Sequence, residues 1–95
     1  MQLRDALFNW LQIQIVWEAR SSDNAAQETV QFFEGILGQD HKVRDIHKKI
    51  DQHEYVVDYV EDGTVKTMRF PREQADQLLQ DIMMEPKYNA SCDGV

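Results

Sequence analysis

Three histidines spaced six residues apart are the first candidates for chemistry, because three imidazoles can hold a zinc ion and leave its fourth position open. They are His41, His47 and His53. A spacing of six does not place side chains on one face of a helix, and the turn predicted before His53 separates it from the other two. We interpret them as exposed strand and loop residues, so the sequence predicts no metal and no other cofactor.

An acidic cluster around a tight turn is the second candidate, because carboxylates are the usual ligands of calcium. It consists of Asp58, Glu61 and Asp62. An EF-hand needs alternating ligands along a loop of about twelve residues that ends in a bidentate glutamate. The cluster has neither this length nor this order, and we interpret it as a solvated turn.

Nucleophile and phosphate-binding motifs are weak in this chain. Ser21, Ser22 and Ser91 stand in a capping region and near the end, without histidine or aspartate at a recognisable spacing. The four glycines are scattered rather than gathered in one loop. We therefore expect no enzymatic activity, and a small enzyme or ligand-binding protein is the weakest of three interpretations.

One basic segment stands out in an acidic chain. Its cations are Lys42, Arg44, Lys48 and Lys49, whereas the whole chain carries a net charge of -7. Four cations on a strand can neutralise a few phosphates. Alternation, however, places these cations on both faces of a strand, and no exposed aromatic residues lie between them to stack on bases. Charged residues on an edge strand also commonly prevent edge-to-edge aggregation. Nucleic-acid binding through residues 42–49 is therefore the second interpretation, and the overall charge disfavours it.

The bulk composition predicts one small domain. A chain of 95 residues with 42% hydrophobic and 28% charged residues has room for a single core. A lone Cys92 fits a reducing compartment, and no run is apolar enough to span a membrane. We expect a cytoplasmic protein without membrane association.

The stretch NWLQIQIVW, residues 9–17, fits both a strand and a helix. It belongs to a segment from Leu3 to Arg20 without glycine or proline, and this length favours a helix. Two apolar arcs then cover more than half of the helix surface. One arc holds Leu3, Ala6, Trp10, Ile13 and Trp17, the other holds Leu7, Phe8, Leu11 and Ile15, and a solvated side holds Asp5, Asn9, Gln12 and Arg20 with Val16 among them.

Two further helices have clear boundaries. Asn24 and Gln27 resemble a capping box, and Gly38 is placed to end the helix that follows them. Its apolar stripe includes Phe32. Pro71 is placed at the first position of the last helix, and Pro86 ends it.

Between these helices the period changes to two, which predicts strands over residues 42–50, 54–60 and 64–70. Asp62-Gly63 predicts a two-residue hairpin. That turn sets Tyr59 against Lys66, Val57 against Met68 and Tyr55 against Phe70 on the core face. A turn at Asp51-Gln52 would add Ile46 and Ile50 to that face and set Lys49 against Glu54.

The predicted fold is therefore α+β, a two-layer sandwich of order α-α-β-β-β-α, with a three-stranded antiparallel meander and helices on one face. Residues 1–86 form the single domain, and residues 87–95 are predicted to be a mobile tail. The most favoured function is a small acidic, non-enzymatic protein-interaction or regulatory module. Its partner is another protein or a second copy of the chain, and the candidate interface is Leu7, Leu11, Ile15, Trp10 and Trp17. The alternative is a central helix over residues 3–20, whose two arcs contact the sheet and the other helices of the same chain.

Overall fold

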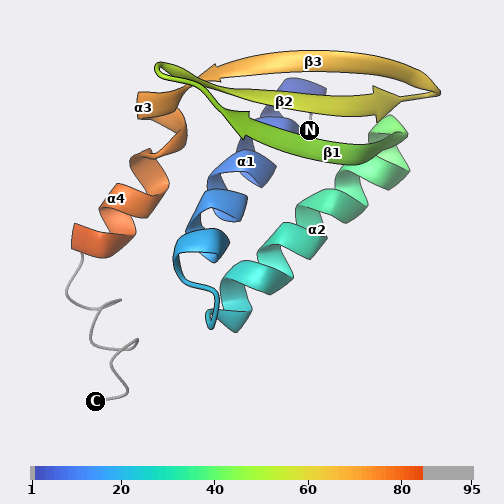
Figure 1. Ribbon diagram of the computed structural model, residues 1–95. Helices are drawn as coiled ribbons and strands as arrows, with labels where there is room; N and C mark the ends of the chain where they lie inside the picture. Colours follow the sequence, from blue (N-terminus) through green and yellow to red (C-terminus); the bar gives the residue numbers. More distant parts are fainter. Residues whose placement is uncertain (1, 85–95) are drawn as a thin grey trace.

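The computed structural model describes residues 2–84, and its helices lie on one face of a three-stranded sheet (Figure 1). The elements are α1 (Leu3–Ala19), α2 (Asn24–His41), β1 (Val43–Ile50), β2 (Glu54–Glu61), β3 (Thr64–Pro71), α3 (Arg72–Ala75) and α4 (Gln77–Met84). The sheet order is β1-β2-β3, and both pairs are antiparallel. The predicted α+β sandwich is confirmed. The end of the last helix at Pro86 and the predicted tail lie outside the described residues.

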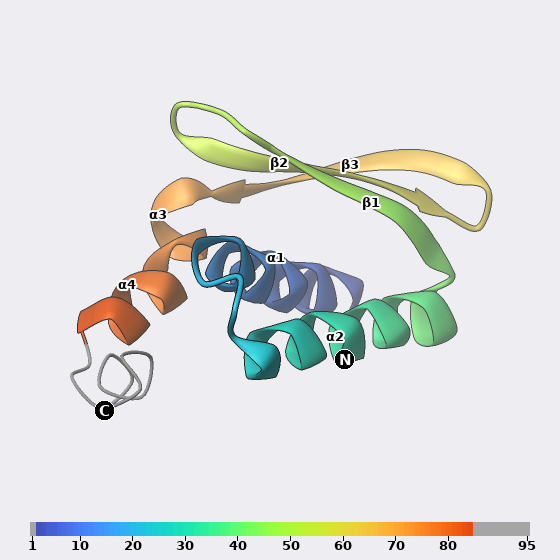
Figure 2. The ribbon, with the colours of Figure 1, turned by 60° about the horizontal axis from the view of Figure 1, so that its bottom comes forward.

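The stretch NWLQIQIVW is helical, as its length predicted, and lies inside α1. This helix lies beneath the sheet, with α2 on one side of it and α4 on the other (Figure 2). A helix with three sets of neighbours needs apolar residues around much of its circumference. The two apolar arcs of α1 are therefore explained by neighbours within the chain.

Val16 corrects the predicted solvated side of α1, because its side chain is only 1% exposed. Gln12, one helical turn earlier on the same side, lines a hollow together with Glu73 and Gln77. The part of this side around Gln12 therefore faces α3 and α4, whereas Asp5 at its beginning is exposed. Position on a helical wheel could not reveal this, because the covering helices lie more than fifty residues later in the chain.

The boundaries of α2 differ from the prediction at both ends. Asp23 is the N-cap, and its Oδ1 accepts a hydrogen bond of 3.1 Å from the backbone N–H of Ala26. At the other end the helix continues past Gly38 to His41, and Lys42 closes it in the left-handed conformation with φ 57°. Phe32 is 61% exposed, so it lies outside the buried stripe in which the sequence placed it.

The β2–β3 hairpin has the predicted turn and register. Asp62 and Gly63 both have positive φ, 50° and 82°, as a primed turn requires. The pairs Tyr59–Lys66, Val57–Met68 and Tyr55–Phe70 are all present. The face that carries Tyr55, Val57, Tyr59 and Phe70 is buried against the helices.

The β1–β2 pairing corrects the prediction. Lys49 lies opposite Val56 instead of Glu54, and Ile50 lies opposite Tyr55. The backbone N–H of Asp51 donates to the carbonyl of Glu54 at 2.8 Å, so the connecting turn is Gln52-His53, one residue later than expected. Ile46 packs against the core as predicted, but Ile50 is 61% exposed because it lies at the end of the sheet.

A bulge in β1 explains how its apolar residues reach one face. The register shifts between Arg44 and His47, and Asp45 between them has φ 53°. Val43 and Ile46 are three residues apart, so a regular strand would place them on opposite faces. The extra residue turns both toward the helices, and Val43 is only 4% exposed.

The last helical segment is divided. Pro71 ends β3 and is the N-cap of α3, instead of the first helical residue. Asp76 separates α3 from α4.

Within residues 2–84, no helix is long and apolar enough to cross a membrane.

Candidate interaction surfaces

The residues proposed from the sequence as a protein interface lie inside the fold. Leu7 and Leu11 are 0% exposed, and Trp10 and Ile15 are buried. The Nε1–H of Trp10 donates to Glu34 Oε2 on α2 at 3.3 Å. Trp17 is half-buried and packs against the core. A partner therefore has no direct access to Leu7 or Leu11, and a binding surface must be sought on other residues.

The four cations of the basic segment do not form one surface. Lys48 lies on the helix-facing side of β1, where its Nζ is 3.0 Å from Glu18 Oε1 of α1. Lys49 points to the opposite side and lies 3.1 Å from Asp58 Oδ2. Lys42 and Arg44 are exposed near the end of α2. Two of the four charges are thus already neutralised by carboxylates of the same chain.

The three histidines are separated along the sheet. His41 ends α2, His47 lies opposite Asp58, and His53 lies in the β1–β2 turn. Within the part of the chain that the structure describes, no group of three histidine, cysteine or acidic residues is arranged to hold a metal ion.

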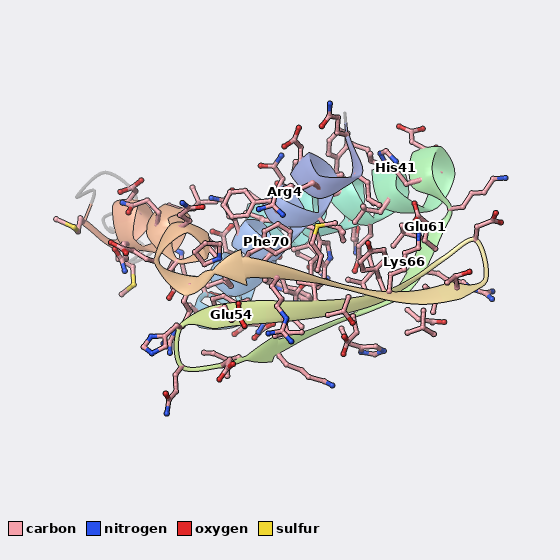
Figure 3. The ribbon with its side chains drawn as sticks, turned by 90° about the horizontal axis from the view of Figure 1, so that it is seen from above. Arg4, His41, Glu54, Glu61, Lys66 and Phe70 are labelled. Atoms are coloured by element: carbon pink, nitrogen blue, oxygen red, sulfur yellow. The ribbon has the colours of Figure 1, made fainter. Side chains whose placement is uncertain are left out.

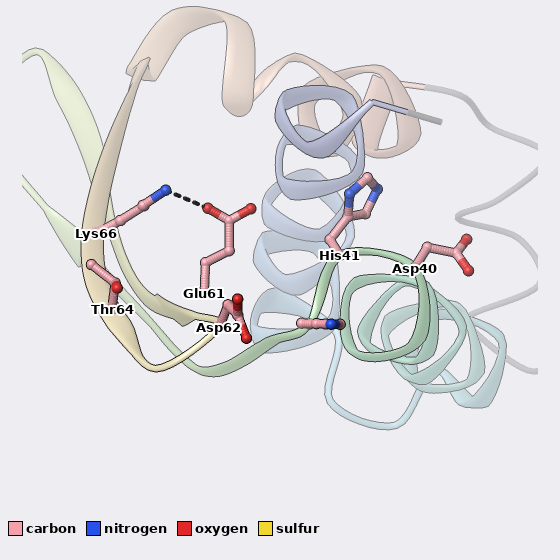
Figure 4. A pocket seen from close by; sticks show the side chains of 7 residues that line it. Asp40, His41, Glu61, Asp62, Thr64 and Lys66 are labelled. Carbon is pink, nitrogen blue, oxygen red and sulfur yellow. Dashed lines mark hydrogen bonds and ion pairs between the residues drawn. The ribbon is translucent and has the colours of Figure 1, made fainter.

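A polar hollow of about 500 Å³ lies beside the β2–β3 turn (Figure 4). We call it the turn hollow, and its lining is Asp40, His41, Lys42, Glu61, Asp62, Thr64 and Lys66. Lys66 Nζ lies 2.6 Å from Glu61 Oε1, and this carboxylate raises the pKa of Lys66. The backbone N–H of Asp62 donates to the carbonyl of Lys42 at 3.1 Å. The sequence did not reveal the hollow, because the predicted helix ended at Gly38, whereas Asp40 and His41 of the lining belong to the last turn of α2.

A second hollow of about 690 Å³ lies between α1, α4 and the β1–β2 end of the sheet. Apolar lining comes from Ile15, Leu79 and Met83. On its sheet side, the Tyr55 hydroxyl donates to Asp76 Oδ1 at 2.7 Å. Burial, followed by the hydrogen bond with Asp76, raises the pKa of Tyr55 to about 12. The phenol therefore stays protonated at neutral pH and acts as a hydrogen-bond donor.

The side of the sheet away from the helices is a broader surface, which we call the outer sheet face. Its residues are Arg44, His47, Lys49, Glu54, Val56, Asp58, Val60, Val65, Thr67 and Arg69. Its β2 and β3 residues alternate with those of the core face, as the predicted hairpin register implies. Val65 is 74% exposed, although it is a β-branched apolar residue.

Charges on the outer sheet face are matched across the strands. The Thr67 hydroxyl donates to Asp58 Oδ1 at 2.8 Å, and Arg69 Nη1 lies 2.8 Å from Glu54 Oε1. The Thr67 hydrogen bond, followed by that from Lys49, lowers the pKa of Asp58. The face therefore carries Val60 opposite Val65 near the turn and Val56 farther along β2, and the Asp58–Thr67 pair lies between them.

The helix-facing side of β3 has its own charged contacts. Figure 3 shows Arg4 beside the ring of Phe70 and Lys66 directed toward Glu61. The guanidinium carbon of Arg4 lies 5.0 Å from the centre of the Phe70 ring. Such a cation–π contact covers the end of β3 that continues into α3. The beginning of the strand, from Thr64 to Thr67, is exposed on both faces.

Comparisons of the chain with protein-family models, with curated proteins and with solved structures give no match.

Proposed function

We propose that this protein is a non-enzymatic protein-interaction module that binds its partner through the outer sheet face and the adjoining edge of β3. The observation that carries the proposal is the exposure of Val65, 74%, on a sheet face opposite the described helices. An exposed valine opposite Val60 favours contact with another protein over contact with water.

The charge arrangement supports a protein partner. Glu54, Asp58, Lys49 and Arg69 are already engaged with one another or with Thr67. A partner that approaches this face therefore has to desolvate little unpaired charge, because each ion pair can stay intact within the contact. Val60 and Val65 supply apolar contact near the turn, and the paired charges farther along β2 and β3 supply polar contact.

The described hollows favour binding over catalysis. Each contains one pair of polar groups that is satisfied within the chain: Lys66 with Glu61 in the turn hollow, and Tyr55 with Asp76 in the second hollow. A catalytic acid or base needs a pKa near the working pH, whereas the pKa of Tyr55 lies far above it.

Site-specific photocross-linking tests the proposed surface. A benzophenone amino acid replaces Val65 in one variant and Glu28, exposed on the helical layer, in a matched control. We expect covalent protein adducts in the native cell from position 65 and few from position 28. Adducts from position 28 alone would place the binding surface on the helices and contradict the proposal. The mass of each adduct also distinguishes a second copy from a different protein.

A further inference from the structure

The two edges of the sheet differ in how regular they are. In β1 the register shifts between Arg44 and His47, and Asp45 has positive φ. A bulge of this kind bends an edge strand and hinders pairing with another strand. In β3 all eight residues, from Thr64 to Pro71, pair with β2 without a shift. The edge of β3 is therefore the better template for an additional strand.

Alternate residues of β3 direct their backbone groups to this edge. Glu61 and Thr64 flank the two-residue turn, so they exchange hydrogen bonds with each other. Counting from this pair, Thr64, Lys66 and Met68 bond to β2, whereas the N–H and C=O groups of Val65, Thr67 and Arg69 point outward. Among the described residues, no strand pairs with this side of β3.

We propose that the partner at this edge is a second copy of the chain, whose β3 pairs antiparallel with the first around a two-fold axis at Thr67. This inference rests on the proposed function and specifies its partner. Thr67 then lies opposite Thr67 of the second copy, and Val65 lies opposite Arg69. The result is a continuous six-stranded sheet with both helical layers on the same side.

The charges of β3 are compatible with this register. Arg69 lies opposite an apolar valine, and its charge is matched by Glu54 of its own chain at 2.8 Å. Lys66 lies opposite Met68 and is matched by Glu61 at 2.6 Å. The two Arg69 side chains are separated by four residues along the strand, about 13 Å, which is beyond the screening length in ordinary salt. Opposed threonines are a favourable cross-strand pair.

Neighbouring registers are less favourable. A shift by one step toward the turn sets Lys66 opposite Lys66 of the second copy, which opposes like charges. A shift by one step the other way sets Val65 opposite Pro71, which has no N–H to donate. Of these three registers, only the one centred on Thr67 pairs Val65, Thr67 and Arg69 entirely with one another and opposes no like charges.

Light scattering after size exclusion, over a range of concentrations, tests the dimer. The wild type should approach twice 11.2 kDa as concentration rises. Thr67→Pro should stay monomeric, because it removes an outward N–H, whereas the matched control Thr67→Ala should still dimerise. Both lose the hydroxyl that bonds to Asp58, so their difference isolates the backbone group. A wild type that remains near 11.2 kDa throughout would overturn the inference.

A charge exchange at position 65 tests the register and does not depend on how well the proline variant folds. Val65→Glu faces Arg69 of the second copy with an opposite charge, whereas Val65→Lys faces it with a like charge. Two such pairs occur in the dimer. The dimer dissociation constant of the glutamate variant should therefore be at least about fivefold lower than that of the lysine variant. Equal dissociation constants would overturn this register.

Disulfide trapping provides an independent measurement. In a Cys92→Ser background, Thr67→Cys should form a disulfide-linked dimer on mild oxidation, because opposed residues in a hydrogen-bonded pair lie about 5.5 Å apart at Cα. Thr64→Cys, also exposed on β3, is the matched control and should cross-link slowly. A monomeric wild type whose position 65 still cross-links to a different protein would reject the second copy and retain the proposed function.

Discussion

At the scale of single residues, Tyr55 shows how the fold determines a side chain's chemistry. Its hydroxyl donates to Asp76 at 2.7 Å, and its ring is 5% exposed beneath the sheet. Both burial and the carboxylate disfavour the phenolate, so the pKa of Tyr55 rises from 10.0 to about 12. The sequence placed Tyr55 on the core face through the hairpin register. It could not reveal Asp76 as the partner, because that residue comes from the break between α3 and α4.

The raised pKa of Tyr55 predicts a loss of stability at alkaline pH. The unfolded chain releases this proton near pH 10, whereas the folded chain holds it up to about pH 12. The stabilisation is complete below pH 10 and is lost as the pH rises through 12. Tyr55→Phe should cost about 1 kcal/mol at neutral pH and should show a shallower decline in this interval.

Urea unfolding at neutral pH and through the alkaline interval measures both effects. Tyr59→Phe is the control, because burial, followed by the charge of Glu61, raises the pKa of Tyr59. We expect the control to lose less stability at neutral pH than Tyr55→Phe. Identical alkaline curves for the wild type and Tyr55→Phe would show that the Asp76 contact does not hold the proton.

At the scale of elements, sequence reasoning succeeded where one local signal was sufficient. Asp62-Gly63 specified both a turn type and a register, and the length of the uninterrupted segment identified α1. Sequence reasoning failed at β1, where it assumed regular alternation along the whole strand. The apolar spacing of Val43 and Ile46 was itself a signal for the β1 bulge, because strict alternation cannot place both on one face.

The candidate interface on α1 shows a second ambiguity, because most of its residues are buried inside the fold. An excess of apolar surface on a helix predicts a neighbour, but it does not say whether that neighbour is the same chain. Here α2, α3, α4 and the sheet all contact α1. The β2 and β3 residues of the outer sheet face, by contrast, followed from the hairpin register alone, because they alternate with the residues of the core face.

A central role for α1 predicts a large effect of truncating its buried side chains. Leu11 is 0% exposed, so Leu11→Ala should destabilise the fold by about 2–4 kcal/mol through lost apolar contact and a residual cavity. Phe32→Ala removes a larger side chain that is 61% exposed and should cost about 1 kcal/mol or less. Urea midpoints of the two variants give the comparison. A larger loss for Phe32→Ala would contradict the assignment of α1 as the centre of the core.

At the scale of the whole molecule, the distribution of charge separates the two main interpretations of function. The chain carries a net charge of -7, and Lys48 and Lys49 are paired with Glu18 and Asp58 on opposite faces of β1. A nucleic acid would meet Lys42 and Arg44 within an acidic surround, and few phosphates could be neutralised together. The matched ion pairs of the outer sheet face present no such obstacle to a protein.

This charge distribution predicts that the protein does not bind nucleic acid at physiological salt. Fluorescence anisotropy with labelled single-stranded and duplex oligonucleotides should show no saturable binding at micromolar protein concentration, because a site that neutralises only two phosphates has a shallow salt dependence and a low affinity. A variant in which Lys42, Arg44, Lys48 and Lys49 are all replaced by glutamine is the control, and it should give the same flat signal as the wild type. Binding that weakens steeply with added salt and disappears in this variant would identify the basic strand as the functional surface. It would also mean that the Lys48–Glu18 and Lys49–Asp58 pairs open to receive phosphate, because in their present geometry, at 3.0 Å and 3.1 Å, the two lysines are already committed to carboxylates.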